Sequence, residues 1–343
     1  MKMHMRWKLL LGLAVSGLFL YYTFYDIDFH DLYDKIRHAR YIYLIPAQLM
    51  LWFGLLCRAQ RFKVITDQKT TISLRDSFSA MMVGYFGNGV LPARLGEFMR
   101  ARVVQKHAHN SYSTSLGFVA LERILDLFYM LLLFLLFLVL SLGSGAAINA
   151  IPRKYLILGG LLAFVPFTML FIILLKESLF KRVVYKLLFF LSEPRRVQII
   201  AVLERFLEAS HAIKKPVFFL RMLYWSLLVW LPVVLNVYFV ILCFPELGTV
   251  PMQGAMLVVI LTAVGISVPQ GPGFVGPYHA AVKLSLSAYS NQESSIGALA
   301  LVLHLVQFIP IILVGWLFFY AEHLRIPKAP PETAQANPVA DGS

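Results

Sequence analysis

The sequence has few charged residues and almost no cysteine. Charged residues make up 14% of the 343 positions, and the two cysteines are Cys57 and Cys243. Both lie in apolar segments, which argues against a disulfide framework and against a thiolate metal site. The chain also lacks a Walker-type phosphate loop, a Gly-x-Ser-x-Gly elbow, a His-Glu-x-x-His zinc motif and an Asp-x-Asp nucleotide-sugar motif. We therefore expect no enzyme activity, cofactor or bound metal.

Hydrophobic residues are abundant instead. They make up 59% of the chain, and the mean hydropathy is +0.72. These values predict a polytopic integral membrane protein built as an all-α helix bundle. A net charge of +13 would favour nucleic acid as a partner of a soluble protein. In a membrane protein it favours cytoplasmic loops that face anionic inner-leaflet lipids, so no nucleic-acid partner is predicted.

The apolar segments predict about seven or eight transmembrane helices, with re-entrant or broken helices in both halves of the chain. The segments are 9–24, 41–57, 116–142, 155–175, 222–243, 252–268 and 296–320. Basic residues next to them predict cytoplasmic N- and C-termini. We expect one transmembrane domain over 1–325, containing cytoplasmic amphipathic helices at 176–221, and a disordered cytoplasmic tail at 326–343.

The stretch 77–91 is too short to cross the membrane. Its fifteen residues would reach roughly 22 Å as a helix, against a hydrocarbon core of about 30 Å. A crossing here would also invert every later loop and place the ten Lys and Arg residues of 176–221 outside, against the positive-inside rule. The sequence therefore predicts a re-entrant element that returns to the cytoplasmic side.

A second interruption follows the segment 252–268. It contains Pro269, Gly271 and Gly273, together with further proline and glycine. Broken helices at corresponding places in two halves of a transporter point to a substrate site near the middle of the membrane. We find no internal repeat that aligns residue by residue, so inverted symmetry stays a hypothesis.

Charged residues gather just after the first interruption. Pro92 is predicted to open a helix that places Arg94, Glu97 and Arg100 on one face near its positive end, a surface that suits a phosphate. Asn88 precedes this turn and is expected to satisfy its backbone groups.

Three more charged residues, Glu122, Arg123 and Asp126, lie near the start of an otherwise apolar helix. Ionisable groups at membrane depth normally pair or face a wet space. Arg94, Arg100 and Arg102 are the expected partners. Two interpretations remain open, a purely structural ion-pair network and a direct part in substrate or proton handling.

Other polar residues have weaker implications. The pairs His304 with Gln307 and His279 with Lys283 lie one turn apart and are interpreted either as packing residues or as part of a relay. His107 and His109 lack further ligands at suitable spacing for a metal. Asn236 is expected to compensate backbone groups freed by Pro232.

These motifs resemble the transmembrane region of lysylphosphatidylglycerol synthases, also called the flippase-like family, over about 9–320. The residues that carry the resemblance are Gly84, Asn88, Leu91 to Arg94, Gly96, Glu97, Arg100, Glu122, Arg123, Asp126, Pro269, Pro272 and Gly273. Gly276, Pro277 and Tyr278 depart from it, because the family turn usually continues with an acidic residue. The resemblance implies a bacterial inner-membrane protein that handles a polar lipid, and it covers no synthase domain.

Three functions are compatible with the sequence. The first is a flippase-like transporter of a phosphate-bearing phospholipid or polyprenyl-linked lipid, with Asn88, Pro269, Gly271, Gly273 and the charged motif residues as its binding site. The second is a non-transporting partner that presents lipid to a separate synthase or glycosyltransferase. The third is a lipid-modifying enzyme with Glu97, Glu122 or Asp126 as general base.

Overall fold

The computed structural model describes residues 2–91, 94–144, 215–267 and 271–324, with isolated positions between 182 and 204. The predicted span 155–175, the tail 326–343, and the residues Pro92 and Pro269 lie outside these ranges, as does most of 176–221. Every regular element in the described ranges is helical, which confirms the all-α prediction. The α-helices are α1 (Lys2–Phe24), α2 (Phe29–Arg37), α3 (Leu44–Thr66), α4 (Leu74–Val90), α5 (Gly96–Ala108), α6 (Tyr112–Ser144), α11 (Pro216–Leu242), α12 (Met252–Gly265), α13 (Pro277–Leu286) and α14 (Glu293–Leu324).

Four helical segments of the described chain are long and apolar enough to cross a membrane. They are Tyr41–Thr66, Tyr112–Ser141, Pro216–Leu242 and Glu293–His323, and shorter apolar helices cover Gly12–Phe24 and Met252–Gly265. The multi-pass prediction is confirmed by these lengths and compositions. Two predicted boundaries are wrong: the second span continues to Thr66, well past Cys57, and α11 begins at Pro216, six residues before the predicted start.

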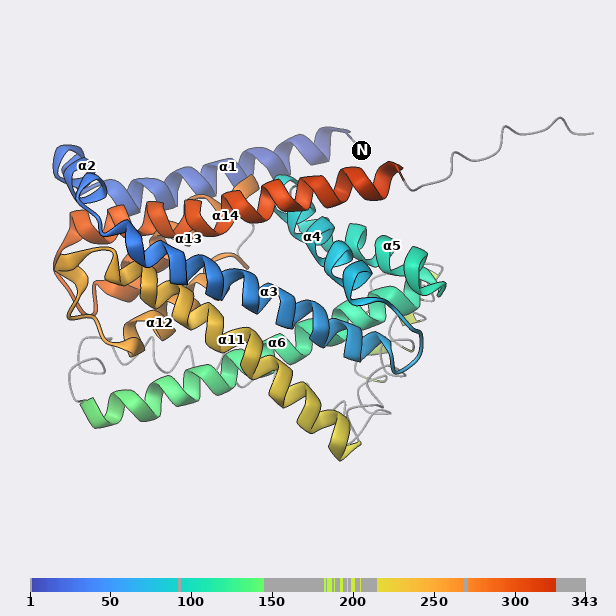
Figure 1. Ribbon diagram of the computed structural model, residues 1–343. Coiled ribbons are helices and arrows are strands. Elements are labelled where there is room, and N and C mark those ends of the chain that lie inside the picture. Colours follow the sequence, from blue (N-terminus) through green and yellow to red (C-terminus); the bar gives the residue numbers. More distant parts are fainter. Residues whose placement is uncertain are drawn as a thin grey trace, which may run out of the picture.

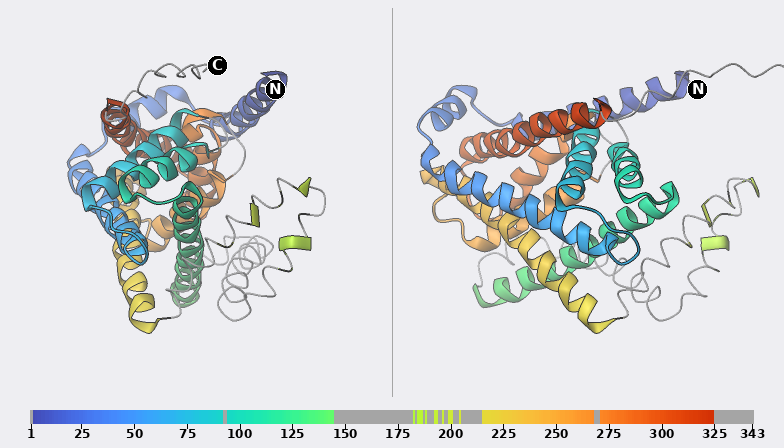
Figure 2. Two further views of the ribbon diagram at one scale, coloured as in Figure 1. Left: turned by 90° about the vertical axis from the view of Figure 1, so that its right-hand side faces the viewer. Right: turned by 45° about the vertical axis from the view of Figure 1, so that its right-hand side comes forward.

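The long helices form a bundle with two distinct ends (Figure 1). The start of α1 and the end of α14 both lie at one end of the bundle, which we call the terminal end, and Figure 2 shows this end facing the viewer in its left view. The short helix α2 lies at the opposite end. There Lys35 bonds to Glu246 over 3.1 Å, and this hydrogen bond raises the pKa of Lys35.

Helices α4 and α5 form a hairpin that starts at the terminal end. Ser73 caps α4 by accepting a hydrogen bond from the Asp76 amide over 3.0 Å, and α4 packs against both α5 and α14. The two hairpin helices touch at glycine, because a Cβ on Gly96 would lie 2.0 Å from the Gly84 carbonyl oxygen. The hairpin reaches only the middle of α14, where a Cβ on Gly89 would lie 3.1 Å from the Phe308 ring.

Helices α12 and α13 form a second hairpin that starts at the opposite end. Gly265, at the end of α12, lies against Pro277 and Ala281 of α13. At the base of this hairpin, Lys283 contacts Glu293, the first residue of α14, over 3.0 Å.

The tip of the second hairpin is the short 3-10 helix η5 (Pro272–Phe274), which also reaches the middle of the bundle. The Gly271 amide donates to the Ser16 hydroxyl in α1, and the Gly273 carbonyl accepts from His304 in α14 over 2.9 Å. Gly273 and Gly276 both have positive φ, which suits glycine at this tight turn. Helix α4 contacts η5 directly, so the tips of the two hairpins meet beside the centre of α14.

Candidate functional site

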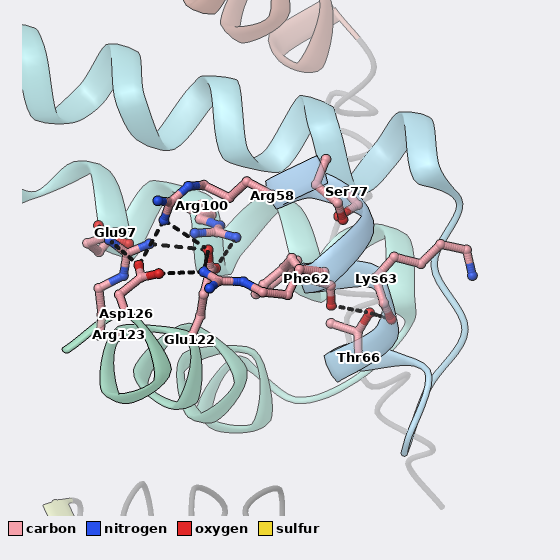
Figure 3. A network of polar contacts seen from close by, with 12 residues as sticks. Arg58, Phe62, Lys63, Thr66, Ser77, Glu97, Arg100, Glu122, Arg123 and Asp126 are labelled. Atoms are coloured by element: carbon pink, nitrogen blue, oxygen red, sulfur yellow. Dashed lines mark hydrogen bonds and ion pairs between the residues drawn. The ribbon is translucent and has the colours of Figure 1, made fainter. Parts of the chain in front are cut away.

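A buried network of charges joins α3, α5 and α6 beside the first hairpin (Figure 3). Glu122 is fully buried and contacts the guanidinium groups of Arg61 at 3.3 Å, Arg100 at 2.5 Å and Arg123 at 3.4 Å. Asp126, one turn later on the same face of α6, contacts Arg61 at 2.5 Å. The expected pairing of these carboxylates with arginines is therefore confirmed for Arg100, one of the three expected partners.

Two arginines of this network, Arg58 and Arg61, were not among the predicted site residues. Arg58 contacts Asp126 at 2.8 Å, and Arg61 also donates to the Ser226 hydroxyl of α11 over 2.9 Å. The predicted second span ended at Cys57, which assigned both arginines to a cytoplasmic loop. Their spacing of three residues within a continuing apolar pattern was the signal that could have placed them on one face of a longer helix.

Aromatic rings help to hold the arginines. The Arg100 guanidinium lies 4.0 Å from the centre of the Phe62 ring, and that of Arg58 lies 5.1 Å from the Trp230 ring. Cation–π contacts of this kind favour a charge that is removed from water. The network is therefore supported by α11 as well as by the three helices that carry its charges.

Glu97 and Asn88 extend the network to the tip of the first hairpin. The Asn88 amide donates to Glu97 Oε1 over 3.2 Å, and Arg123 lies 3.9 Å from the same oxygen. Asn88 was expected to satisfy backbone groups of the turn. The structure instead gives it a side-chain partner across the hairpin, from α4 to α5.

Arg94 does not join the network as predicted. Helix α5 begins at Gly96, and Arg94 precedes it with a left-handed backbone, φ 55°, so Arg94 is not on the helical face that carries Glu97 and Arg100. Its side chain is exposed, and it has no ion pair within the described part of the chain. Arg102, another expected partner, bonds to Gln105 instead.

The network has more positive than negative groups. Four arginines, at positions 58, 61, 100 and 123, face the three carboxylates of Glu97, Glu122 and Asp126, which leaves one formal positive charge in excess. Several of their N–H groups, including Arg61 Nε and Arg100 Nε, are buried without a hydrogen-bond acceptor among the described residues. A surplus of buried donors and positive charge suits an anion.

The predicted residues of the second interruption that the structure describes, Gly271 and Gly273, bond to residues outside the charge network. Gly271 and Gly273 form the second tip, and the His304 contact to Gly273 described above belongs to the same tip. Tyr278 donates to Gln307, and Gln307 donates to Asn236 over 2.6 Å. Asn236 in turn donates to the Ala47 carbonyl of α3, so the expectation that it compensates Pro232 is wrong.

A smaller cluster ties the base of the first hairpin to the end of α14. Glu322 accepts from Ser79 over 2.8 Å and contacts His107 at 2.9 Å and Lys106 at 3.3 Å. In the part of the chain that the structure covers, no group of three or more His, Cys, Asp or Glu side chains is arranged to hold a metal. His107 is a hydrogen-bond partner of Glu322 in this cluster.

The fold and the site together define a membrane protein in which two broken helical hairpins meet beside a buried arginine-rich network. The model of the lysylphosphatidylglycerol synthase transmembrane region matches residues 9–315. The chain belongs to this family, and no synthase domain is matched with it. A comparison with curated proteins finds no match.

Proposed function

We propose that this protein moves a phosphate-bearing polar lipid, a phospholipid or a polyprenyl-linked lipid, between the leaflets of a bacterial inner membrane. Membership of a family related to membrane lipids supports the substrate class. The basic terminal end is the cytoplasmic end in this proposal, following the positive-inside rule.

The observation that carries the proposal is the meeting of the two hairpin tips next to surplus guanidinium groups. A lipid head group that crosses the hydrocarbon core loses its hydration, which is costly for a charged phosphate. Charged donors and irregular backbone at mid-depth lower that cost, while the acyl chains remain in the surrounding lipid. No catalytic step is part of this proposal.

Arg94 provides the direct test, because it is an exposed arginine beside the network and the fold does not depend on an ion pair with it. We expect Arg94→Ala to lower the rate of lipid transfer in reconstituted vesicles by about tenfold or more, the effect of losing a charge-assisted hydrogen bond of about 1.5–3 kcal/mol. Leaflet-specific chemical labelling of the lipid head groups measures this rate.

The matched control is Arg102→Ala, which removes another exposed arginine eight residues away. Its rate should stay within about twofold of wild type, since among the described residues its side chain bonds to Gln105 of its own helix and lies over the Tyr112 ring at the start of α6. Equal rates for wild type and Arg94→Ala, or a wild-type rate no higher than that of empty vesicles, would refute the proposal.

A further inference from the structure

Among the described residues, the charge network is most exposed at Glu97 and Arg123. The side chains of Arg61 and Glu122 are fully buried, whereas Glu97 is 23% and Arg123 is 35% exposed. Arg94, which is exposed, lies just before α5 and precedes Glu97 by three residues. We call Arg94, Glu97 and Arg123, together with Asn88, which donates to Glu97, the mouth of the network.

The mouth has two acceptors that lack donors. Glu97 Oε1 accepts from Asn88, but Glu97 Oε2 is buried and has no hydrogen-bond donor among the described residues. The carbonyl oxygen of the Asn88 side chain is also buried and has no donor there. Unsatisfied buried acceptors are costly, about 1–3 kcal/mol each, and they are uncommon in folded proteins. A donor from outside the chain would remove this cost.

The same mouth has donors that lack acceptors. Arg123 Nε and Nη2 are buried without a hydrogen-bond acceptor in the described ranges, although Nη2 lies 3.4 Å from Glu122. Arg94 adds an exposed guanidinium that has no ion pair among the described residues. A ligand that satisfies both sets of groups must therefore carry an anion and a hydrogen-bond donor close together.

We propose that the mouth selects lipids whose head group carries an N–H or O–H donor next to its phosphate. The phosphate binds Arg94 and Arg123, and the donor binds Glu97. This inference rests on the proposed function and narrows its substrate class. A hydroxyl and an ammonium group can both donate a hydrogen bond to Glu97. The selected class is therefore defined by a hydrogen-bond donor beside the phosphate, whichever of the two groups supplies it.

Two pairs of acyl-labelled lipids test this selection, because each pair differs in the donor and not in net charge. Phosphatidylglycerol is compared with phosphatidylmethanol, and phosphatidylethanolamine is compared with phosphatidylcholine. In vesicles that contain the full chain, we expect the donor lipid of each pair to transfer about tenfold faster than its partner. The ratio of the two transfer rates in each pair is measured with the wild-type protein alone, so it does not depend on whether a variant folds.

Variants then assign the selection to Glu97. Glu97→Ala should reduce both ratios to within about twofold. Glu97→Gln keeps an acceptor and removes the charge, so it should reduce the ethanolamine ratio more than the glycerol ratio. Glu246→Ala, which removes a carboxylate at the opposite end of the molecule, should leave both ratios unchanged.

The outcomes separate this inference from the proposed function. Wild-type ratios near one, with all four lipids transferred faster than in empty vesicles, overturn the inference and leave the transport proposal intact. Ratios that persist in Glu97→Ala overturn the assignment to the mouth. Transfer of none of the lipids above the empty-vesicle rate overturns both.

Discussion

At the scale of single residues, the network depends on mutual compensation of buried charges. Taking an ion out of water costs several kcal/mol, and attraction to well-placed partners offsets that cost. Glu122 is fully buried and faces guanidinium groups from α3, α5 and α6. It is therefore the residue whose charge matters most to the stability of this region.

We expect Glu122→Gln to reduce the free energy of unfolding by about 3–5 kcal/mol, because it leaves buried arginines without compensation. Denaturant unfolding of the purified protein in detergent measures the change. Lys63→Ala is the control, since the Lys63–Asp67 pair is partly exposed and a pair of this kind contributes about 0–1 kcal/mol. A Glu122→Gln protein as stable as the Lys63→Ala protein would contradict this expectation.

At the scale of elements, the close approach of α4 and α5 positions Asn88 next to Glu97. A Cβ on Gly96 would lie 2.0 Å from the Gly84 carbonyl oxygen and 2.4 Å from the backbone nitrogen of Asn88. Neither atom belongs to a flexible side chain, so the two helices must separate to admit a methyl group. The close contact between Gly84 and Gly96 therefore determines the geometry of the hairpin.

We expect Gly96→Ala to destabilise the protein by about 1–3 kcal/mol, the usual cost of forcing extra volume into a packed contact. The shift in melting temperature measures the effect. Gly17→Ala is a matched control in α1, because a Cβ there meets nothing within 4 Å and alanine is the better helix former. If both variants melted at the same temperature, the close packing of the hairpin would be wrong.

Local sequence rules predicted the interruptions but not all of the partners across them. The shortness of 77–91 and the glycine and proline cluster near Gly271 indicated two broken elements, and both occur in the structure as hairpin tips. The predicted start of α5 was wrong because a left-handed residue, Arg94, delays the helix by several positions. Backbone conformation of this kind depends on the tertiary turn and not on the local pattern.

The charged site was predicted in part for a similar reason. Glu97, Arg100, Glu122, Arg123 and Asp126 were grouped from their spacing, and the structure brings them together. Arg58 and Arg61 were assigned to a loop because charge was taken to end the span. In the fold these arginines are buried beside the carboxylates that α6 supplies, a contact that no local pattern of α3 contains.

At the scale of the whole molecule, the two hairpins start at opposite ends of the bundle, and their tips meet beside the centre of α14. We therefore propose that they enter the membrane from opposite sides. Contacts along α14 show where each hairpin starts and where its tip lies. The first hairpin contacts Glu322 at one end of α14, the second contacts Glu293 at the other, and both tips lie near Phe308. Of the seven or eight transmembrane helices predicted from sequence, four correspond to long apolar helices in the described ranges.

Cysteine labelling measures this arrangement directly. In a background with the buried Cys57 and Cys243 replaced by alanine, single cysteines are introduced at exposed positions and treated with a membrane-impermeant thiol reagent from each side. Positions 75 and 109 flank the first hairpin, position 90 lies at its tip, and positions 249 and 291 flank the second hairpin; all five residues are exposed.

Labelling from the two sides tests the opposed entry of the hairpins. We expect cysteines at 75 and 109 to react from the cytoplasmic side, those at 249 and 291 to react from the opposite side, and the cysteine at 90 not to react from the side opposite to 75. Reaction of 75 and 109 from different sides, reaction of 249 and 291 from different sides, or reaction of all four from the same side would contradict this arrangement. So would reaction of 90 from the side opposite to 75.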